Sequence, residues 1–397
     1  MGIYYLGTRQ SDIAASLDAK VLDDFFDGSI VVYGNDGGAH AAFNSRTGVQ
    51  PSFAGPQGPE VKQFISNFFA DECKKIVEKD KDALFFPYSY EYVALVPKDL
   101  RCRIRCANDL ETLVYLNSKF NFKKLIQGKI NQAPHKFLSG QQILDEKPEN
   151  VVAQTEYGAG GSGTYFLPKD ILKIDPKNMY VVSDFVPNLC SVGVQVQISN
   201  NQVAAYPPSI QIMKGPSWIG SDLHGFSKLD PKVQKACIKQ AITFGELLRE
   251  KGIRGFMGLD MIVGKDNRVY AIETNARFTG LVGLLNALSH KANIGSVYKH
   301  TYQAFYDPQT NFKKDFAKIS NTFRLRHAKT KTDSHGKIKS LDKGFNQEGF
   351  TKTCVHQEGM YTHAVYENLE EEISKYNAYD DRELQKEYLS SIRSKPN

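Results

Sequence analysis

The chain has little cysteine, and its cysteines lack the spacing of a metal site. Six of 397 residues are cysteine, at positions 73, 102, 106, 190, 237 and 354, and no two form a CxxC pair. Zinc sites of the usual kind need closely spaced cysteines, and a chain of this length can bury enough apolar surface to fold without disulfides. We therefore expect reduced thiols, and neither a zinc finger nor a disulfide scaffold.

Long apolar runs and a secretory signal are also missing. No stretch approaches the ~20 apolar residues that a membrane-spanning helix needs. The first residues, MGIYYLGTRQ, lack the basic segment followed by an apolar segment that is typical of an exported protein. The expected location is the cytoplasm, without a membrane partner.

No charge of one sign dominates. The 50 basic and 44 acidic residues leave a formal charge of +6, which argues against nucleic acid as the main partner. With 41% hydrophobic and 24% charged residues, the composition is typical of a globular protein of two or three domains. A local basic pocket for phosphate stays open.

Hydrophobic patterns predict an α/β unit at the start of the chain. SIVVYG (29–34) and EYVALVP (91–97) have the composition of strands, and EVKQFISNFFADECKKIVEK (60–79) between them has a helical pattern. Further helical segments are predicted over residues 109–129 and 232–252.

Two apolar runs that flank GKDN predict a β-hairpin in GLDMIVGKDNRVYAIETNARFTG, from Gly258 to Gly280. With Gly264 to Asn267 as the loop, Val263 would face Arg268 and Asp260 would face Ala271. The period of two of a strand then gives two faces. One carries Asp260, Glu273, Asn275 and Arg277, and the other carries Met261, Tyr270 and Ile272.

The polar face of this hairpin has the chemistry of a cation site beside an anion site. Two carboxylates and an amide oxygen suit Mg²⁺, and a guanidinium suits a carboxylate or phosphate. An amphipathic hairpin with a solvated face is the alternative, and the hairpin alone does not decide between the two.

A glycine-rich turn between two predicted strands is the second candidate for chemistry. It is GAGGSG, Gly158 to Gly163, within NVVAQTEYGAGGSGTYFLP. Glycines let backbone N–H groups turn toward a phosphate, and Ser162 or Thr164 could add a hydroxyl. The loop is neither a Walker loop nor a Rossmann fingerprint, because no Gly-Lys-Ser/Thr and no helix follows. It is either a lid over phosphates or an ordinary hairpin turn.

The glycine-rich hairpin and, about a hundred residues later, GLDMIVGKDNRVYAIETNAR together resemble the ATP-grasp superfamily, over roughly Leu110 to Ala304. In that superfamily two α+β subdomains hold ATP and a carboxylate is phosphorylated. The resemblance implies a fold of α/β plus α+β character, with an N-terminal α/β (pre-ATP-grasp) domain before a two-subdomain ATP-grasp fold. The expected boundaries are 1–112 for the N-terminal domain, 113–187 for the small subdomain with the glycine-rich loop, 188–310 for the large subdomain with the metal site, and 311–397 for a C-terminal extension.

The resemblance also implies cofactors and site residues. The cofactors are ATP and Mg²⁺. Asp260, Glu273 and Asn275 match the metal ligands, and Arg277 matches the catalytic arginine that meets the substrate carboxylate or acyl phosphate. The implied nucleotide-binding residues are Lys119, which resembles the first ATP-binding lysine, Gly160, Gly161, Ser162, Gly163 and Thr164 of the loop, and Ser183, Asp184, Phe185 and Val186 of the hinge whose backbone pairs with adenine.

Two positions depart from the family pattern. The acidic ribose contact expected soon after the hinge is absent near Cys190. Gln154 stands where the second phosphate-binding lysine is expected, and its amide can donate a hydrogen bond but carries no charge. If the register of this strand differs, Lys136 or Lys147 would reach the phosphates instead.

The implied activity is that of an ATP-dependent carboxylate-amine ligase. It would form an amide or peptide bond through an acyl phosphate and release ADP and phosphate, with a small carboxylate and an amine, amino acids among them, as partners. A carboxylase-like enzyme acting on bicarbonate and a non-catalytic nucleotide-binding protein are the alternatives. Gln211, Lys214, His224 and the only tryptophan, Trp218, are candidate pocket residues, although structural roles are equally open. A homodimer is also left open.

Overall fold

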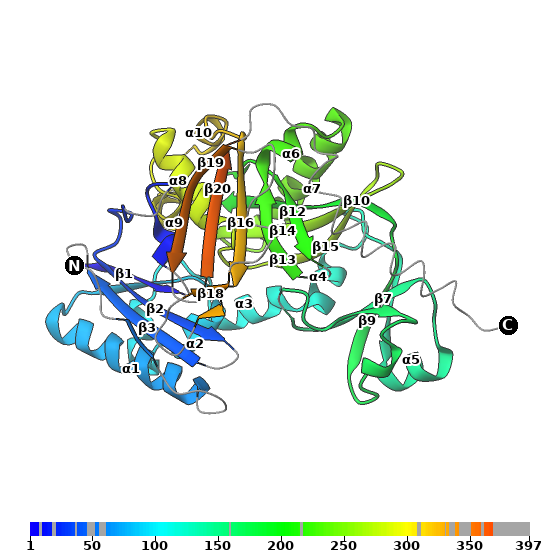
Figure 1. Cartoon of the computed structure of the whole chain (residues 1–397), viewed down its shortest axis with the longest axis horizontal. Helices are drawn as coiled ribbons and strands as arrows, with labels where there is room; N and C mark the ends of the chain where they lie inside the picture. Colours follow the sequence, from blue (N-terminus) through cyan, green and yellow to red (C-terminus); the bar gives the residue numbers. More distant parts are fainter. Residues whose placement is uncertain are drawn as a thin grey trace.

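The computed structural model describes residues 1–7, 10–17, 21–35, 38–45, 52–54, 61–158, 160–214, 217–307, 311–329, 331–332, 338–340, 351–358 and 361–367. Three larger sheets and the helices packed along them form this part of the chain (Figure 1). No helix in these residues is both long enough and apolar enough to cross a membrane.

The first sheet belongs to the N-terminal α/β domain and has the strand order β4-β3-β2-β1-β5. Its strands are β1 (Ile3–Gly7), β2 (Gly28–Asn35), β3 (Gly38–Ser45), β4 (Ser52–Ala54) and β5 (Leu84–Pro87), with the 3-10 helix η1 (Gln10–Ile13) after β1. β1 pairs in parallel with both β2 and β5. Helix α1 (Val61–Lys79) buries Phe69 and Cys73 against the sheet residues Leu6 and Ile30. The predicted strand over 29–34 and helix over 60–79 are confirmed.

The strand predicted over 91–97 is wrong, because residues 91–95 belong to helix α2 (Tyr90–Leu95) and Val96 and Pro97 connect it to the 3-10 helix η3 (Lys98–Arg103). The strand beside β1 is instead β5, whose four residues LFFP are all buried. In α2 only Val93 is buried. A sheet position buried on both faces needs a continuous apolar run, which LFFP supplies and EYVALVP does not.

The helical segment predicted over 109–129 divides at Ser118 into α3 (Leu110–Asn117) and α4 (Lys119–Ile126). Ser118 has extended backbone angles, and its Oγ accepts the N–H of Asn121 at 3.2 Å and donates to Glu156 Oε1 at 2.6 Å. Ser118 is therefore the N-cap of α4. The division places Lys119 in the first turn of α4, beside the glycine-rich loop.

The second sheet is antiparallel and has the strand order β6-β9-β7-β8. Its strands are β6 (His135–Ser139), β7 (Val151–Thr155), β8 (Thr164–Leu167) and β9 (Met179–Asp184), with helix α5 (Gly140–Glu146) and the 3-10 helix η4 (Ile171–Lys173) beside them. Gln154 pairs with Thr164, which confirms the predicted strand, glycine-rich turn and strand. This sheet lies at the lower right of Figure 1.

The third sheet has nine strands in the order β15-β14-β10-β12-β13-β16-β20-β19, with β11 on β10. They are β10 (Asn188–Ile198), β11 (Val203–Ala205), β12 (Ser209–Lys214), β13 (Ser217–Asp222), β14 (Gly255–Gly264), β15 (Val269–Asn275), β16 (Phe323–Lys329), β19 (Thr351–Glu358) and β20 (Tyr361–Glu367). β17 (Lys331–Thr332) and β18 (Ile338–Ser340) pair separately.

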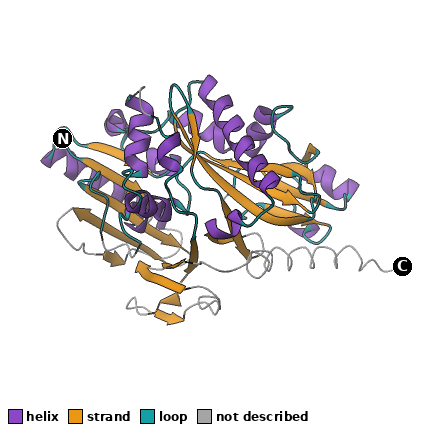
Figure 2. Ribbon diagram, turned by 90° about the horizontal axis from the view of Figure 1, so that it is seen from above, coloured by secondary structure: helices purple, strands orange, loops and turns teal. Residues whose placement is uncertain are grey.

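Helices cover the third sheet, as the view from above shows (Figure 2). They are α6 (Leu223–Ser227), α7 (Pro231–Glu250), α8 (Val282–Lys291), α9 (Val297–Tyr306) and α10 (Lys313–Phe316). The helix predicted over 232–252 is confirmed as α7, which packs Phe244 and Leu248 against Val192 and Val194 of β10. The expected boundary at 310 remains a prediction; beyond it, β16 pairs with β13 and extends the same sheet.

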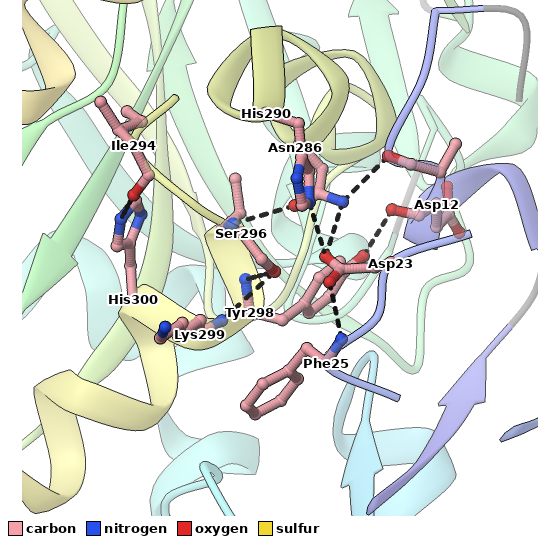
Figure 3. Close-up of polar contacts among 12 residues, drawn as sticks. Asp12, Asp23, Phe25, Asn286, His290, Ile294, Ser296, Tyr298, Lys299 and His300 are labelled. Carbon is pink, nitrogen blue, oxygen red and sulfur yellow. Dashed lines mark hydrogen bonds and ion pairs between the residues drawn. The ribbon is translucent and has the colours of Figure 1, made fainter. Parts of the chain in front are cut away.

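A buried polar cluster joins the N-terminal domain to the corner between α8 and α9 (Figure 3). Asn286 Nδ2 donates to the Ala14 carbonyl and to Asp23 Oδ2, both at 2.9 Å, and its Oδ1 accepts the N–H of Val297 at 2.9 Å. His290 Nε2 lies 3.3 Å from Asp23 Oδ2. These contacts connect segments more than 260 residues apart in sequence.

Candidate active site

A cavity of about 610 Å³ lies between the second and third sheets. Its walls come from the glycine-rich hairpin, from the hinge between β9 and β10, and from the β14–β15 hairpin. Of the residues predicted for the site, all except Gly163 line it: Lys119, Gln154, Gly160, Gly161, Ser162, Thr164, Ser183, Asp184, Phe185, Val186, Asp260, Glu273, Asn275 and Arg277. The fold therefore brings together groups that the sequence spreads over more than 150 residues.

The glycine-rich loop depends on glycine for its shape. Gly160, Gly161 and Gly163 have φ values of +60°, +86° and +72°, in the left-handed region that residues with a Cβ rarely adopt. A Cβ on Gly163 would also lie 2.0 Å from Thr155 Oγ1. Gly163 therefore packs against Thr155 on the side of the loop that faces away from the cavity, which explains why it does not line the cavity.

The hinge holds its backbone in place through neighbouring loops. The N–H of Asp184 donates to the Pro134 carbonyl at 2.9 Å, and that of Phe185 donates to the Asn150 carbonyl at 2.8 Å. Ser183 Oγ is buried and has no hydrogen-bond partner among the residues that the structure describes. An unpaired buried hydroxyl in a cavity wall is a place where a ligand atom would satisfy a hydrogen bond.

The register of the β14–β15 hairpin differs from the prediction. The N–H of Gly264 donates to the Arg268 carbonyl at 2.8 Å and closes a loop one residue longer than predicted, so Val263 pairs with Val269 instead of Arg268. Closer to the site, Asp260 pairs with Glu273 instead of Ala271. The two carboxylates are direct cross-strand neighbours.

A β-bulge in β15 explains this arrangement. The register shifts between the Met261–Ala271 and Asp260–Glu273 pairs, which leaves Ile272 as the extra residue. Tyr270 and Ile272 were expected opposite the polar face, and this is wrong, because both line the cavity. A bulge inserts one residue into one strand and so changes which residues share a face. The extra residue lets Glu273 follow Ile272 on the cavity side.

Each residue predicted to hold the metal contacts a neighbouring polar side chain. Asn275 Nδ2 donates to Asp260 Oδ2 at 2.8 Å. Lys119 Nζ lies 3.0 Å from Glu273 Oε2 and donates to the Gly158 carbonyl at 3.0 Å. Burial raises the pKa of Asp260 to about 7, the charge of Glu273 adds to the rise, and a hydrogen bond from Gln211 opposes it.

The described residues contain no group of three or more histidine, cysteine, aspartate or glutamate side chains that could hold a metal ion. The candidate set is therefore two carboxylates and one amide, Asp260, Glu273 and Asn275. Such a small oxygen set fits Mg²⁺, which takes one or two protein carboxylates and completes its shell with water and phosphate.

Arg277 lies where two cavities meet. It lines the main cavity and a second one of about 160 Å³, which Tyr90 and Tyr157 also line. Its Nη1 donates to the Phe278 carbonyl at 3.1 Å. One end of the guanidinium is thereby held by the backbone, beside the candidate metal residues.

Several cavity residues are not among the predicted site residues. Ser191, Gly193 and Gln195 line the cavity from β10, and their alternation in SVGVQVQ is a signal that strand periodicity could have supplied. Lys123 also lines it, one helical turn after Lys119. Of the pocket candidates between hinge and hairpin, Gln211 and Trp218 line the cavity.

Three further candidates, His224, Lys136 and Lys147, do not line this cavity. His224 lies buried in α6 and is not among the lining residues. Lys136 and Lys147, the alternatives to Gln154, are also absent from the lining. The Lys214 side chain lies outside the described residues.

The expected reduced state of the cysteines is confirmed where the side chains are described. Cys73, Cys102, Cys106, Cys190 and Cys237 are free thiols. Burial raises the pKa of Cys73 and of Cys237 to about 12, so neither is suited to act as a nucleophile at neutral pH.

Comparisons with known proteins agree with this geometry. The family model described as ATP-grasp domain matches residues 116–281. Curated protein sequences show no match to this chain. N5-carboxyaminoimidazole ribonucleotide synthetase from Thermotoga maritima is 15% identical, with a TM-score of 0.53 over 97% of this chain and 98% of that chain.

Two biotin carboxylases are similar as well. That of Campylobacter jejuni is 16% identical, with a TM-score of 0.55 over 78% of this chain and 75% of that chain. The biotin carboxylase domain of Hydrogenobacter thermophilus 2-oxoglutarate carboxylase, in complex with MgADP, ADP and bicarbonate, is 12% identical, with a TM-score of 0.54 over 75% of this chain and 73% of that chain. At such identities the likeness concerns the fold. This chain therefore contains an ATP-grasp domain over residues 116–281, preceded by an N-terminal α/β domain.

Proposed function

We propose that this chain is an ATP-dependent carboxylate-amine ligase that forms a C–N bond through an acyl phosphate and releases ADP and phosphate. The observation that carries the proposal is the convergence of Asp260, Glu273, Asn275 and Arg277 with the glycine-rich loop on one cavity. Transfer of a phosphoryl group to a carboxylate brings two anions together, and these side chains supply cation binding and an anion contact at the same place.

The cavity fits a nucleotide on three counts. Its volume of about 610 Å³ lies within the range of ligand sites. The unpaired Ser183 Oγ and the hinge backbone offer hydrogen bonds at one end. At the other end, Gly160 and Gly161 leave the loop backbone open to approach by phosphate.

Each side chain then has a distinct task. Lys119 would bind a phosphate oxygen, since its ammonium stands between the loop and Glu273. The loop over the cavity would keep water from the acyl phosphate. Bound Mg²⁺ and ATP supply charge neutralisation and the phosphoryl group, while Arg277 would orient the acid.

The far end of the cavity suits a small acid and a polar amine. Apart from Lys123 on α4, the described lining beyond the predicted nucleotide and metal residues is neutral, with Gln195, Gln211, Ser221 and Trp218. Arg277 is the one arginine among the described lining residues. A substrate with a single carboxylate matches this charge better than a substrate that carries a further phosphate.

A second candidate is a carboxylase-like reaction on bicarbonate. The similar solved structures favour it, since one is in complex with bicarbonate and another is an N5-carboxyaminoimidazole ribonucleotide synthetase. Arg277 would serve bicarbonate as well as a larger acid. The third hypothesis is a nucleotide-binding protein without catalytic activity, and only the neutral Gln154 supports it.

Product analysis tests the proposal. The purified chain is incubated with Mg²⁺ and ATP and screened against pairs of carboxylates and amines, amino acids included, for phosphate release, with mass spectrometry of the product. ADP formation that requires both an acid and an amine, with an amide product, supports a ligase. Turnover that requires bicarbonate supports the second candidate. ATP binding without turnover on any acid overturns both.

A further inference from the structure

Lys123 is a buried lysine in the wall of the proposed nucleotide cavity. Only 3% of its surface is exposed, and it lines the cavity together with Ala133, Val152 and Ser183. Its Nζ donates to the Ala271 carbonyl at 3.3 Å. An ammonium has three N–H donors, so one neutral carbonyl leaves this cation poorly satisfied.

The electrostatic environment of Lys123 favours the binding of an anion beside it. Burial lowers the pKa of Lys123 to about 8, and the charge of Glu273 opposes the shift. Buried lysines are uncommon unless they are paired. The nearest carboxylate, Glu273, is in contact with Lys119 instead, at 3.0 Å from its Nζ.

The place of Lys123 on α4 indicates which part of a nucleotide it would meet. Lys119 lies at the loop and at Glu273, which is the end for the terminal phosphates. Residues four apart on a helix share a face, about 6 Å apart. Gln132 Nε2 donates to the Lys123 carbonyl at 3.3 Å, and His135, three residues after Gln132, pairs with the hinge residue Ser183. Lys123 therefore lies on the hinge side of Lys119, between the expected places of the terminal phosphates and the adenine.

We propose that Lys123 binds the phosphate nearest the nucleoside and supplies the positive charge that Gln154 lacks. Gln154 is 8% exposed and its amide donates to Thr164 Oγ1 at 3.4 Å. With Gln154 neutral, Lys119 and Lys123 are the lysines among the described lining residues. This inference rests on the proposed nucleotide site, but not on which acid or amine is used.

Calorimetric titration with ADP, AMP and adenosine tests the inference. In Lys123→Met the Kd for ADP and for AMP should rise about tenfold or more, the usual effect of losing a charge-assisted hydrogen bond. The Kd for adenosine should hardly change. Lys123→Gln keeps a donor for the Ala271 carbonyl but not the charge, and should behave in the same way.

A second substitution tests whether the two positions share one task. Adding Gln154→Lys to Lys123→Met should recover most of the ADP affinity. Lys124→Met, on the exposed side of the same helix, is the matched control and should bind like wild type. Thermal unfolding of each variant shows whether it is folded.

Two outcomes would overturn the inference about Lys123, and a third would overturn the proposed function. Wild-type affinity for ADP in folded Lys123→Met and Lys123→Gln would make Lys123 a tether between α4 and β15 and overturn the inference. An equal loss for adenosine and ADP would also overturn it, because the contact would then be with the nucleoside. Failure of the wild type to bind any nucleotide would instead remove the proposed function itself.

Discussion

Glu273 contacts the Lys119 ammonium at 3.0 Å, and in the proposed site it would also bind a divalent cation together with Asp260, its cross-strand neighbour. The charge of Glu273 would therefore affect the site both without and with a bound metal ion. Replacing it by glutamine keeps the volume and removes the charge, so the effects on binding and on folding can be separated.

We expect Glu273→Gln to abolish Mg²⁺-dependent turnover, because the charge that bridges metal and phosphates is lost. The Tm should stay close to that of wild type, because the loss of the ion pair with the buried Lys119 is offset by the loss of the repulsion between Glu273 and Asp260. Asp266→Asn, in the exposed turn of the same hairpin, serves as the control. Near-normal turnover in the glutamine variant would remove Glu273 from the site.

Arg277→Lys should lower kcat more than it weakens ATP binding. An ammonium cannot reproduce the two parallel hydrogen bonds of a guanidinium to a carboxylate or acyl phosphate. Turnover is measured at saturating ATP beside an ATP titration without acid. If nucleotide affinity collapsed while the acid still bound normally, Arg277 would contact the nucleotide and not the acid.

The residues that line the main cavity were well predicted from sequence, since all the predicted site residues except Gly163 do so. The polar set of the hairpin and the loop glycines belong to local patterns whose period or composition is visible in one segment. Lys123 and Gln195 were missed because their importance comes from burial beside a cavity, and burial depends on which distant strands pack there. Strand periodicity suggests a face, but only the assembled sheets show what that face meets.

At the scale of secondary structure elements, the glycine-rich hairpin carries a sharp prediction. Gly163→Ala places a Cβ against Thr155 Oγ1 at a positive φ, and the backbone alone resists this by about 1 kcal/mol or more. We expect the Kd for ATP to rise about tenfold as the loop shifts.

Gly160→Ala is the matched control for this change. Gly160 has φ +60° but nothing lies within 4 Å of a Cβ built there. It should weaken ATP binding less than Gly163→Ala does. Equal effects of the two substitutions would show that backbone angle alone, and not the contact behind the loop, shapes the lid.

Elements were predicted more accurately than their registers. Periodicity identified α1, α7 and both hairpins, yet it missed the bulge at Ile272 and took 91–97 for a strand. A bulge breaks the period of two on which face assignment depends. Residues 91–97 have the apolar composition of a strand, but β5 occupies the sheet position beside β1. Which segment fills that position depends on tertiary packing and not on local sequence.

At the scale of the whole molecule, the Asp23 cluster joins the N-terminal domain to α8 and α9. Burial raises the pKa of Asp23, but hydrogen bonds from His290, Ser296, the Phe25 backbone and Asn286 together outweigh it and lower the pKa overall. The hydrogen bond to Asp23 raises the pKa of His290 against the opposing effect of burial. Both shifts favour the charged pair.

Stability should therefore depend on pH through this pair. A histidine whose pKa is raised in the folded state stabilises the fold below its unfolded pKa of about 6.5, and this contribution is lost as pH rises through the folded value. A lowered aspartate pKa contributes above about 3.9 and is lost as pH falls through the folded value. The pair contributes most between these limits.

His290→Gln should accordingly lower the urea midpoint more at mildly acidic than at alkaline pH. His300→Gln, in the same corner, is the comparison, because burial lowers the pKa of His300 and its removal should have the reverse pH trend. Parallel pH curves for His290→Gln and wild type would show that the pair does not hold the domains together.

Trp218 gives the cavity an optical property of its own. It is the only tryptophan in the chain, it lines the main cavity, and a Cβ on Gly280 would lie 2.6 Å from its ring. All indole emission of the protein therefore originates beside the place assigned to the acid and the amine. A ligand that reaches that end should change the intensity or wavelength of this emission, so unlabelled protein can report substrate entry in real time.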